Sequence, residues 1–400
     1  MLQKDNYDLG ITVDSADAYR YFIIGLDESL GLDSSGIESF IKSLSFEPDF
    51  ALAYALLAKQ LAIYGSPIKA KQYLDLALHH KHKSSLREQS AINIISMLIE
   101  NKTSCLDAAL EHIHDYPNDT IILPLIVGPF GLLAFSGSLY WRERNLKILK
   151  GVESSFFSDD WWFKTTQAFM FVENGEIKKA STYGQIAWDI KNTGNCAHTL
   201  THIHYESSKY KEGRQFIKEW RLSFKDSSNM LHHIEWHNAL LSLKLNKKDE
   251  IFPIFEKLIS NKDGVAPLEY LADNVSLLWY CIIEDIIIPR TWNNEMHKYI
   301  DKYFPDIGFK FVDLHRSMLA ATGSSEEREA YLKWIETEDN NARSTLTELT
   351  QGFIAFFDGN YSDSIRYLEK IEPFNAIYGG SNVQRYIIGE TNKIAHLQKI

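Results

Sequence analysis

Apolar residues recur every three or four positions along most of the chain, the spacing that buries one face of an α-helix. The segment from Ala70 to Leu78 (AKQYLDLAL) is typical, with small or apolar side chains at Ala70, Leu74 and Ala77. Alternating β-branched runs around Asn-Gly or Asp-Gly turns, which predict strand hairpins, are not found. Helix-length segments are separated by short breaks of Gly, Asn, Asp or Pro, so the pattern predicts an all-α fold.

Three segments share a helical-hairpin pattern of about 34 residues. The first, beginning near Ala51, has its pattern positions at Tyr54, Leu57, Ala58, Leu61, Gly65, Ala70, Leu74 and Ala77. Matching offsets are held in a second unit by Ala168, Phe171, Gly175, Ala180 and Ala187, and in a weaker third by Gly352, Gly359, Ser364 and Leu368. These are consensus positions of a tetratricopeptide repeat, in which small residues let two antiparallel helices touch. Because such hairpins bury a continuous core only against their neighbours, we expect a tetratricopeptide-like superhelix, an α-solenoid forming one domain over residues 1–400 with a concave inner face.

One uncharged run, from Thr120 to Trp141, is long enough to cross a bilayer. Two prolines and three glycines interrupt it. We therefore favour two helices buried between neighbouring repeats, with a break near Gly128-Pro129, over a membrane span. The first eight residues (MLQKDNYD) have no apolar run behind a basic cluster, so they do not predict a secretory signal.

Composition and charge narrow the range of partners. Hydrophobic residues make up 45% of the chain and charged ones 24%, as in globular proteins. The net charge, 42 − 53 = −11, argues against a nucleic-acid partner, whose binders present clustered Lys and Arg. Three widely spaced cysteines, Cys105, Cys196 and Cys281, predict neither a disulfide framework nor a CxxC metal site. We expect a cytoplasmic protein with no nucleic-acid or membrane partner.

Six short patterns stand out between about Tyr7 and Glu390. They are Ser85-Leu-Arg-Glu-Gln89, His198-Thr-Leu-Thr-His202-Ile-His204, His233-x-x-Trp236-His237, Asp273-x-x-Ser276-Leu-Leu-Trp279, Phe311-x-Asp313-x-His315 and Gly379-Gly-Ser-Asn-x-Gln384-Arg385. Together they resemble the tetratricopeptide repeat protein 38 family, which implies a helical-repeat fold and brings no settled activity. The chain departs from that family at Tyr205, where Glu is usual and Glu206 follows, and at Tyr386, which replaces an acidic residue. It also ends soon after Arg385, where relatives carry further helices, and an end without a polar cap raises the hypothesis of a homodimer.

Two pairs of histidines are the most informative polar residues. His198 and His202 are four residues apart, as are His233 and His237, so each pair lies on one helix face. The first members are 233 − 198 = 35 residues apart, close to one repeat, which would place the pairs side by side. If Ser208 occupies the turn, the first pair points into the inner groove.

A later repeat adds acidic and imidazole groups to this array. Asp313 falls on a groove position when counted back from Gly323, and His315 follows it. Neutral imidazoles with a carboxylate suit a transition metal such as zinc, iron or copper. They also suit acid–base chemistry near neutral pH. A third interpretation is a polar network that ties drifted repeats together by hydrogen bonds, and His204, at a packing position, is expected in the core.

A glycine-rich turn forms a second candidate site. Gly379 and Gly380 precede a predicted helix with Ser381 as its N-cap, which would leave backbone N–H groups free to meet an anion. Arg385 would clamp a carboxylate or phosphate. The alternative is an ordinary capped loop in which Arg385 makes a structural ion pair. Phosphate-loop, nucleophile-elbow, HExxH and dinucleotide fingerprints are absent from the sequence.

Three functions follow from these residues and remain open at this point. The first is a binding protein that holds a small polar ligand or a peptide in a His-lined pocket, with ligand-binding residues Trp236, Glu206, Ser381, Gln384 and Arg385. The second is an enzyme that holds a transition metal or moves protons, with catalytic residues His198, His202, His233, His237, Asp313 and His315. The third is a scaffold for protein partners.

Overall fold

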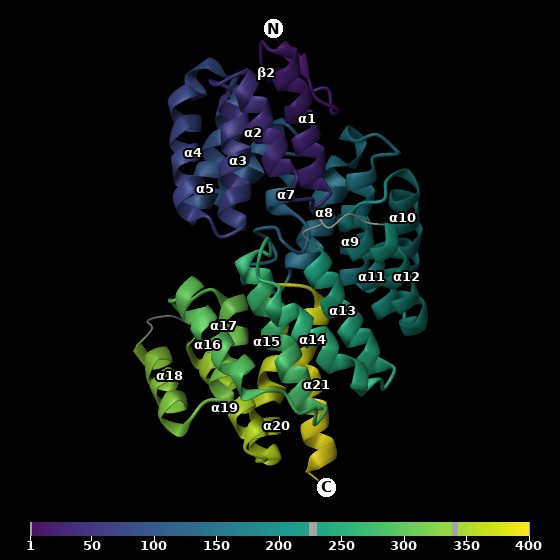
Figure 1. Cartoon of the computed structure of the whole chain (residues 1–400), viewed down its shortest axis with the longest axis vertical. Coiled ribbons are helices and arrows are strands. Elements are labelled where there is room, and N and C mark those ends of the chain that lie inside the picture. Colours follow the sequence, from purple (N-terminus) through teal and green to yellow (C-terminus); the bar gives the residue numbers. More distant parts are fainter. Residues whose placement is uncertain (1, 224–229, 338–342, 400) are drawn as a thin grey trace. The chain divides into compact units, whose positions relative to one another are not determined.

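The computed structural model describes residues 2–223, 230–337 and 343–399. Its regular structure is almost entirely helical (Figure 1), which confirms the predicted all-α helical-repeat fold class. A small antiparallel ribbon, formed by β1 (Leu2–Lys4) and β2 (Gly10–Thr12), is the one sheet among the described residues. The sequence pattern did not predict this ribbon.

The helices fall into two compact units. The first comprises Met1–Leu133, Glu143–Ile234 and Gly264–Ala266, and the second comprises Ala134–Arg142, Glu235–Asp263 and Pro267–Ile400. Two helices, α8 (Trp141–Val152) and α13 (Leu231–Lys244), carry the chain from one unit into the other. The expectation of one superhelical domain over residues 1–400 stays a prediction.

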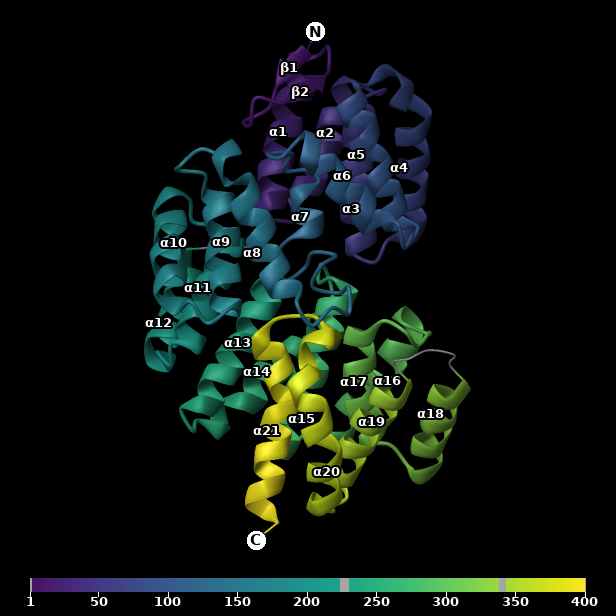
Figure 2. The same ribbon diagram turned by 180° about the vertical axis from the view of Figure 1, so that it is seen from behind.

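The first unit consists of helices packed pairwise along the chain. They are α1 (Ala16–Leu30), α2 (Gly36–Phe46), α3 (Ala51–Ile63), α4 (Pro67–His80), α5 (Leu86–Ile99), α6 (Cys105–Asp115), α7 (Leu123–Ile126), α9 (Trp161–Glu173), α10 (Ile177–Ile190), α11 (Gly194–Glu206) and α12 (Tyr210–Ser223). Short 3₁₀ segments follow α4 and α8, at Lys81–Lys83 and Glu153–Ser155. Figure 2 shows α9 to α12 side by side. Helix α11 of this layer carries His198 and His202, the first two residues of the candidate site.

The second unit repeats this arrangement. Its helices are α14 (Ile251–Ser260), α15 (Pro267–Ile283), α16 (Arg290–Tyr303), α17 (Lys310–Ala321), α18 (Ser325–Thr337), α19 (Arg343–Phe357), α20 (Tyr361–Ile371) and α21 (Asn382–Gln398), with 3₁₀ segments at Lys248–Glu250 and Glu372–Tyr378. Helix α17 packs between α15 and α19, and α21 packs against α20 and α15.

The three predicted hairpins are α3 with α4, α9 with α10, and α19 with α20. The chain turns between the helices of each pair at Gly65, Gly175 and Gly359, whose φ angles are 71°, 77° and 75°. A Cβ on Gly352 of α19 would lie 2.5 Å from the Leu368 side chain of α20, so the small residue sets the helix separation. These positions confirm the helical-hairpin pattern read from the sequence.

The uncharged run from Thr120 to Trp141 differs from expectation. The two buried helices predicted there are wrong, because only α7 is helical before α8 begins at Trp141. The predicted break near Gly128-Pro129 is present: Gly128 has a φ of 87°, and its N–H donates a 2.8 Å hydrogen bond to the Asn145 side chain. Within the part of the chain that the structure describes, we find no helix with the length and apolar character that a membrane span requires.

The Ser85–Gln89 pattern has a structural use. Ser85 caps α5 with a capping box, and the Arg87 guanidinium donates a 2.6 Å hydrogen bond to the buried Asp119 carboxylate. The His112 ring lies 2.9 Å from that carboxylate. Although burial alone raises the pKa of Asp119, the His112 hydrogen bond and the Arg87 charge hold it below its ordinary value. This buried network fixes the segment after α6 to the start of α5.

Candidate functional site

The four paired histidines lie on two helices, α11 and α13. His198 and His202 are one turn apart on α11, and His233 and His237 are one turn apart on α13, as the four-residue spacing predicts. The first unit contains three of these residues, and His237 follows on the same continuous helix. Exposed fractions of 1%, 0%, 3% and 0%, in chain order, remove all four side chains from solvent.

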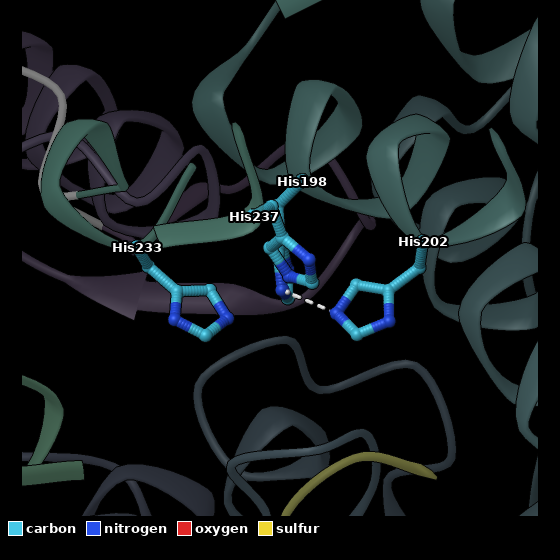
Figure 3. A group of neighbouring side chains, drawn as sticks. All are labelled: His198, His202, His233 and His237. Atoms are coloured by element: carbon cyan, nitrogen blue, oxygen red, sulfur yellow. Dashed lines mark hydrogen bonds between the residues drawn. The ribbon is translucent and has the colours of Figure 1, made fainter. Parts of the chain in front are cut away.

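The imidazole rings of the two helices converge (Figure 3). The His198 ring centroid lies 4.6 Å from that of His202 and 5.0 Å from that of His233. The Nε2 atoms of His198 and His202 are 2.9 Å apart, so one donates a hydrogen bond and the other accepts it. Each of the four residues offers one ring nitrogen, and these nitrogens all lie within 4.8 Å of one another.

Burial decides the charge of His198 and His202. Desolvation lowers the pKa of His198 well below the ordinary imidazole value, and the neighbouring His202 and His233 lower it further. The pKa of His202 falls well below that value for the same main reason, with His233 as the second cause. Both rings are therefore neutral at pH 7, and a neutral imidazole keeps one nitrogen lone pair available as a ligand.

Aromatic rings surround the histidines. The Phe169 ring of α9 stacks 5.5 Å from His198, and the Phe130 ring stacks 5.9 Å from it. Along α13, the predicted ligand-binding residue Trp236 lies beside His237, with ring centroids 4.8 Å apart. The indole N–H of Trp236 donates a 2.9 Å hydrogen bond to Ser276, so this side chain is fixed within its own unit. Apolar walls of this kind strengthen electrostatic interactions inside the site.

Asp313 and His315 lie on α17 in the second unit. The Asp313 carboxylate accepts a 3.1 Å hydrogen bond from the Gly308 N–H, and the ring Nδ1 of His315 lies 2.7 Å from the Phe311 carbonyl oxygen. Burial lowers the pKa of His315 to about 4, against smaller opposing effects of Phe311 and Asp273. Within the described residues, neither Asp313 nor His315 belongs to a group of donors close enough to share an ion. Their catalytic role stays a prediction.

Glu206, Ser381 and Gln384 occupy helix ends. Glu206 is the last residue of α11 and is half-buried. Ser381 is the N-cap of α21, as predicted, and the Gln384 side chain accepts a 2.9 Å hydrogen bond from the Ser381 N–H. This capping box uses the N–H groups of Ser381 and Gln384, two of the backbone groups that the anion hypothesis expected to be free. A ligand-binding role of these three residues stays a prediction.

Arg385 forms its hydrogen bonds within the glycine-rich turn that precedes α21. Its side chain is 1% exposed, and its guanidinium donates to the carbonyl oxygens of Gly379 and Gly380 and to the Asn382 side chain at 2.7 Å. The guanidinium carbon lies 5.4 Å from the centre of the Trp141 ring. These contacts hold the glycine turn in place, and an anion clamp by Arg385 stays a prediction.

Sequence reasoning did not single out Phe130 and Phe169 as site residues. Phe169 follows Ala168, a repeat position that the hairpin pattern did identify, so its place beside a neighbouring repeat was available from the periodicity. Phe130 stands between Gly128 and Gly131 in the uncharged run. An aromatic residue enclosed by turn residues was the signal there, because a loop tip needs a reason to carry a large apolar side chain.

Comparison with known proteins yields little. No family model matches the chain. One solved structure to which the chain is similar is the crystal structure of the P58(IPK) TPR domain, at 14% sequence identity, covering 96% of this chain and 88% of that one, with a TM-score of 0.22. The all-α fold class follows from the helices described above.

Proposed function

We propose that this helical-repeat protein binds one transition-metal ion through His198, His202, His233 and His237. The single observation that carries the proposal is the set of four ring nitrogens within 4.8 Å of one another. Imidazole nitrogen is a preferred ligand of zinc, copper, iron and nickel, and two helices each supplying an i, i+4 pair hold four such ligands in one place.

The donor geometry supports an ion at the centre of the four rings. Zinc–nitrogen bonds of about 2.1 Å place the donors of a tetrahedral site about 3.4 Å apart. From the 4.8 Å limit, the widest pair would therefore have to close by about 1.4 Å on ion binding. The His198–His202 pair, at 2.9 Å, would open by about 0.5 Å as an ion replaces the shared hydrogen.

Burial favours an ion over a larger occupant. The four side chains are between 0% and 3% exposed, so a peptide has no imidazole edge to contact. An ion needs only a path of small diameter, and its bonds to the four ring nitrogens replace the water ligands that it loses on entry. The resemblance to the tetratricopeptide repeat protein 38 family, a cytoplasmic location and protein or peptide partners belong to this proposal as expectations.

Metal analysis of the purified protein tests the proposal. We expect about one equivalent of zinc, copper, iron or nickel after exposure to the ion and removal of excess. Replacing His198 and His233 with alanine together should abolish that equivalent. His204→Ala is the matched control, because His204 lies on the same helix and packs near Phe216 instead, with ring centroids 5.7 Å apart.

Two results would contradict metal binding. One is a wild-type protein that retains no ion after dialysis at pH 7.5. The other is a double variant that keeps the full equivalent, which would move the ion to another site. Circular dichroism should show unchanged helicity in the variants. If the alanine variants do not fold, His202→Gln, which retains volume and polarity, replaces them and should lower the metal affinity at least tenfold.

A further inference from the structure

Four neutral ligands leave the charge of a bound ion uncompensated. Metal-binding imidazoles are neutral, so a divalent ion on His198, His202, His233 and His237 would keep both positive charges. These side chains are nearly inaccessible, and a charge taken out of water is strongly disfavoured unless it is paired. A small anion on the ion would restore part of the balance, since a coordinating anion stands closer to the charge than any solvent molecule outside.

We propose that the metal-loaded histidine cluster binds a small inorganic or carboxylate anion as an additional ligand, which enters past the ring of Phe130. This inference rests on the proposed metal site. It assigns the cluster a ligand class: anions of a few atoms, such as hydroxide, azide or formate. It also assigns Phe130 the role of a gating residue, whose side chain limits the size of the anion that can enter.

The ring contacts of His198 point to the entry. His198 contacts two phenylalanines, with Phe169 at 5.5 Å and Phe130 at 5.9 Å. Phe169 is 2% exposed and lies on α9 inside the unit. Phe130 is 51% exposed, so its ring borders solvent on one side and the cluster on the other. Of these two rings, only that of Phe130 can control the access of an anion from solvent to the histidines.

The loop that carries Phe130 is fixed at both ends. The Gly128 N–H donates to the side chain of buried Asn145, and the Leu132 N–H donates a 2.8 Å hydrogen bond to the Leu125 carbonyl. At Gly131 a Cβ would lie 2.4 Å from the Ile126 carbonyl oxygen, so the chain makes a close turn there. The backbone therefore holds the position of Phe130, and entry requires only rotation of its side chain, which occurs within nanoseconds for an exposed residue.

Azide binding to the copper(II)-loaded protein tests this inference. The metal content is measured first, so that the metal site and the anion site are judged separately. Titration with azide should then produce a charge-transfer absorption band that saturates at one azide per copper. Phe130→Ala should speed azide binding severalfold and admit a larger anion, benzoate, that the wild-type protein excludes. Phe157→Ala is the matched control, because Phe157 is another exposed phenylalanine, 62% exposed.

Each outcome decides a separate claim. If copper binds at one equivalent but azide changes neither the absorption nor the electron paramagnetic resonance spectrum, the anion site is overturned and the metal site stands. If azide binds but Phe130→Ala leaves the rate and the anion size limit unchanged, the entry past Phe130 is overturned. If no metal binds, the proposed function and this inference both fail. An azide band that persists in the His198→Ala, His233→Ala protein would assign the signal to copper elsewhere on the surface and overturn the inference.

Discussion

At the scale of single residues, burial of His315 couples folding to pH. The folded pKa of this imidazole is about 4, whereas an imidazole in an unfolded chain titrates near 6.5. As the pH falls below 6.5, the unfolded chain takes up the proton first, so His315 destabilises the fold progressively until its folded pKa is reached. The free energy of unfolding is therefore unaffected by His315 protonation at neutral pH and decreases as the pH falls below 6.5.

His315→Asn is expected to remove this pH dependence. Asparagine can keep a donor near the Phe311 carbonyl oxygen, which lies 2.7 Å from Nδ1 in the wild type. Its side chain does not ionise. Between pH 7 and pH 5 the wild-type protein should lose about 2 kcal/mol more stability than the variant. Urea unfolding at a series of pH values measures the difference. Parallel stability curves for the two proteins would show that His315 is not the group responsible.

The histidine cluster shows what residue spacing can and cannot predict. The four-residue intervals within each pair place two rings on one helix face, and the 35-residue interval between His198 and His233 matches one repeat. Both rules are local, so the sequence contains them. The neutral state of His198 depends on desolvation and on neighbouring imidazoles, which only tertiary packing supplies. The turn residues around Phe130 mark it as unusual, but its contact with His198 spans many residues of sequence and comes only from tertiary packing.

At the scale of elements, close contact between paired helices depends on small residues. Gly352 of α19 faces Leu368 of α20, and a Cβ at position 352 would lie 2.5 Å from the leucine side chain. Real side chains do not approach that closely, so one helix or the leucine has to move. Gly151, near the end of α8, offers a contrast, because a Cβ there would meet no atom within 4 Å.

Gly352→Ala and Gly151→Ala are expected to act in opposite directions. The first should destabilise the protein by about 1–3 kcal/mol through overpacking of the α19–α20 hairpin. The second should stabilise it by up to about 1 kcal/mol, because alanine has the higher helix propensity and meets no obstacle. Urea or thermal unfolding of both variants measures the effects. Equal and small shifts would show that the hairpin adapts by moving Leu368 at no cost.

Elements were predictable where their signals are local. The turn glycines Gly65 and Gly175 and the cap Ser381 mark positions that depend on a few neighbouring residues. The prediction of two helices in the uncharged run was wrong because prolines and glycines interrupt any helix there. Before α8 begins, only Leu123–Ile126 is helical. Its burial comes from tertiary contacts, which an apolar composition cannot distinguish from a helix core. The N-terminal ribbon, with strands of three residues, is too short to give an alternating pattern.

At the scale of the whole molecule, metal binding and folding are linked. An ion that binds the folded chain and not the unfolded one stabilises the fold by about 2.7 kcal/mol when its free concentration is one hundred times the dissociation constant. The four proposed ligands come from two helices, α11 and α13, that are separate in sequence. The unfolded chain does not hold both pairs together, so differential binding is expected.

Unfolding midpoints with and without metal test this linkage. We expect zinc in excess over the protein to raise the urea midpoint relative to the same protein in a chelator, and the transition that reports on the first unit should move because that unit contains His198, His202 and His233. His204→Ala should retain the shift, since His204 is not among the four donors. The His198→Ala, His233→Ala protein should lose the zinc-dependent shift. Only two donors remain in that protein, and two bonds to the ion are too few to offset the cost of ordering both helices around it. A shift of equal size in that double variant would mean that zinc stabilises the chain through other groups, and the four-histidine assignment would then be wrong.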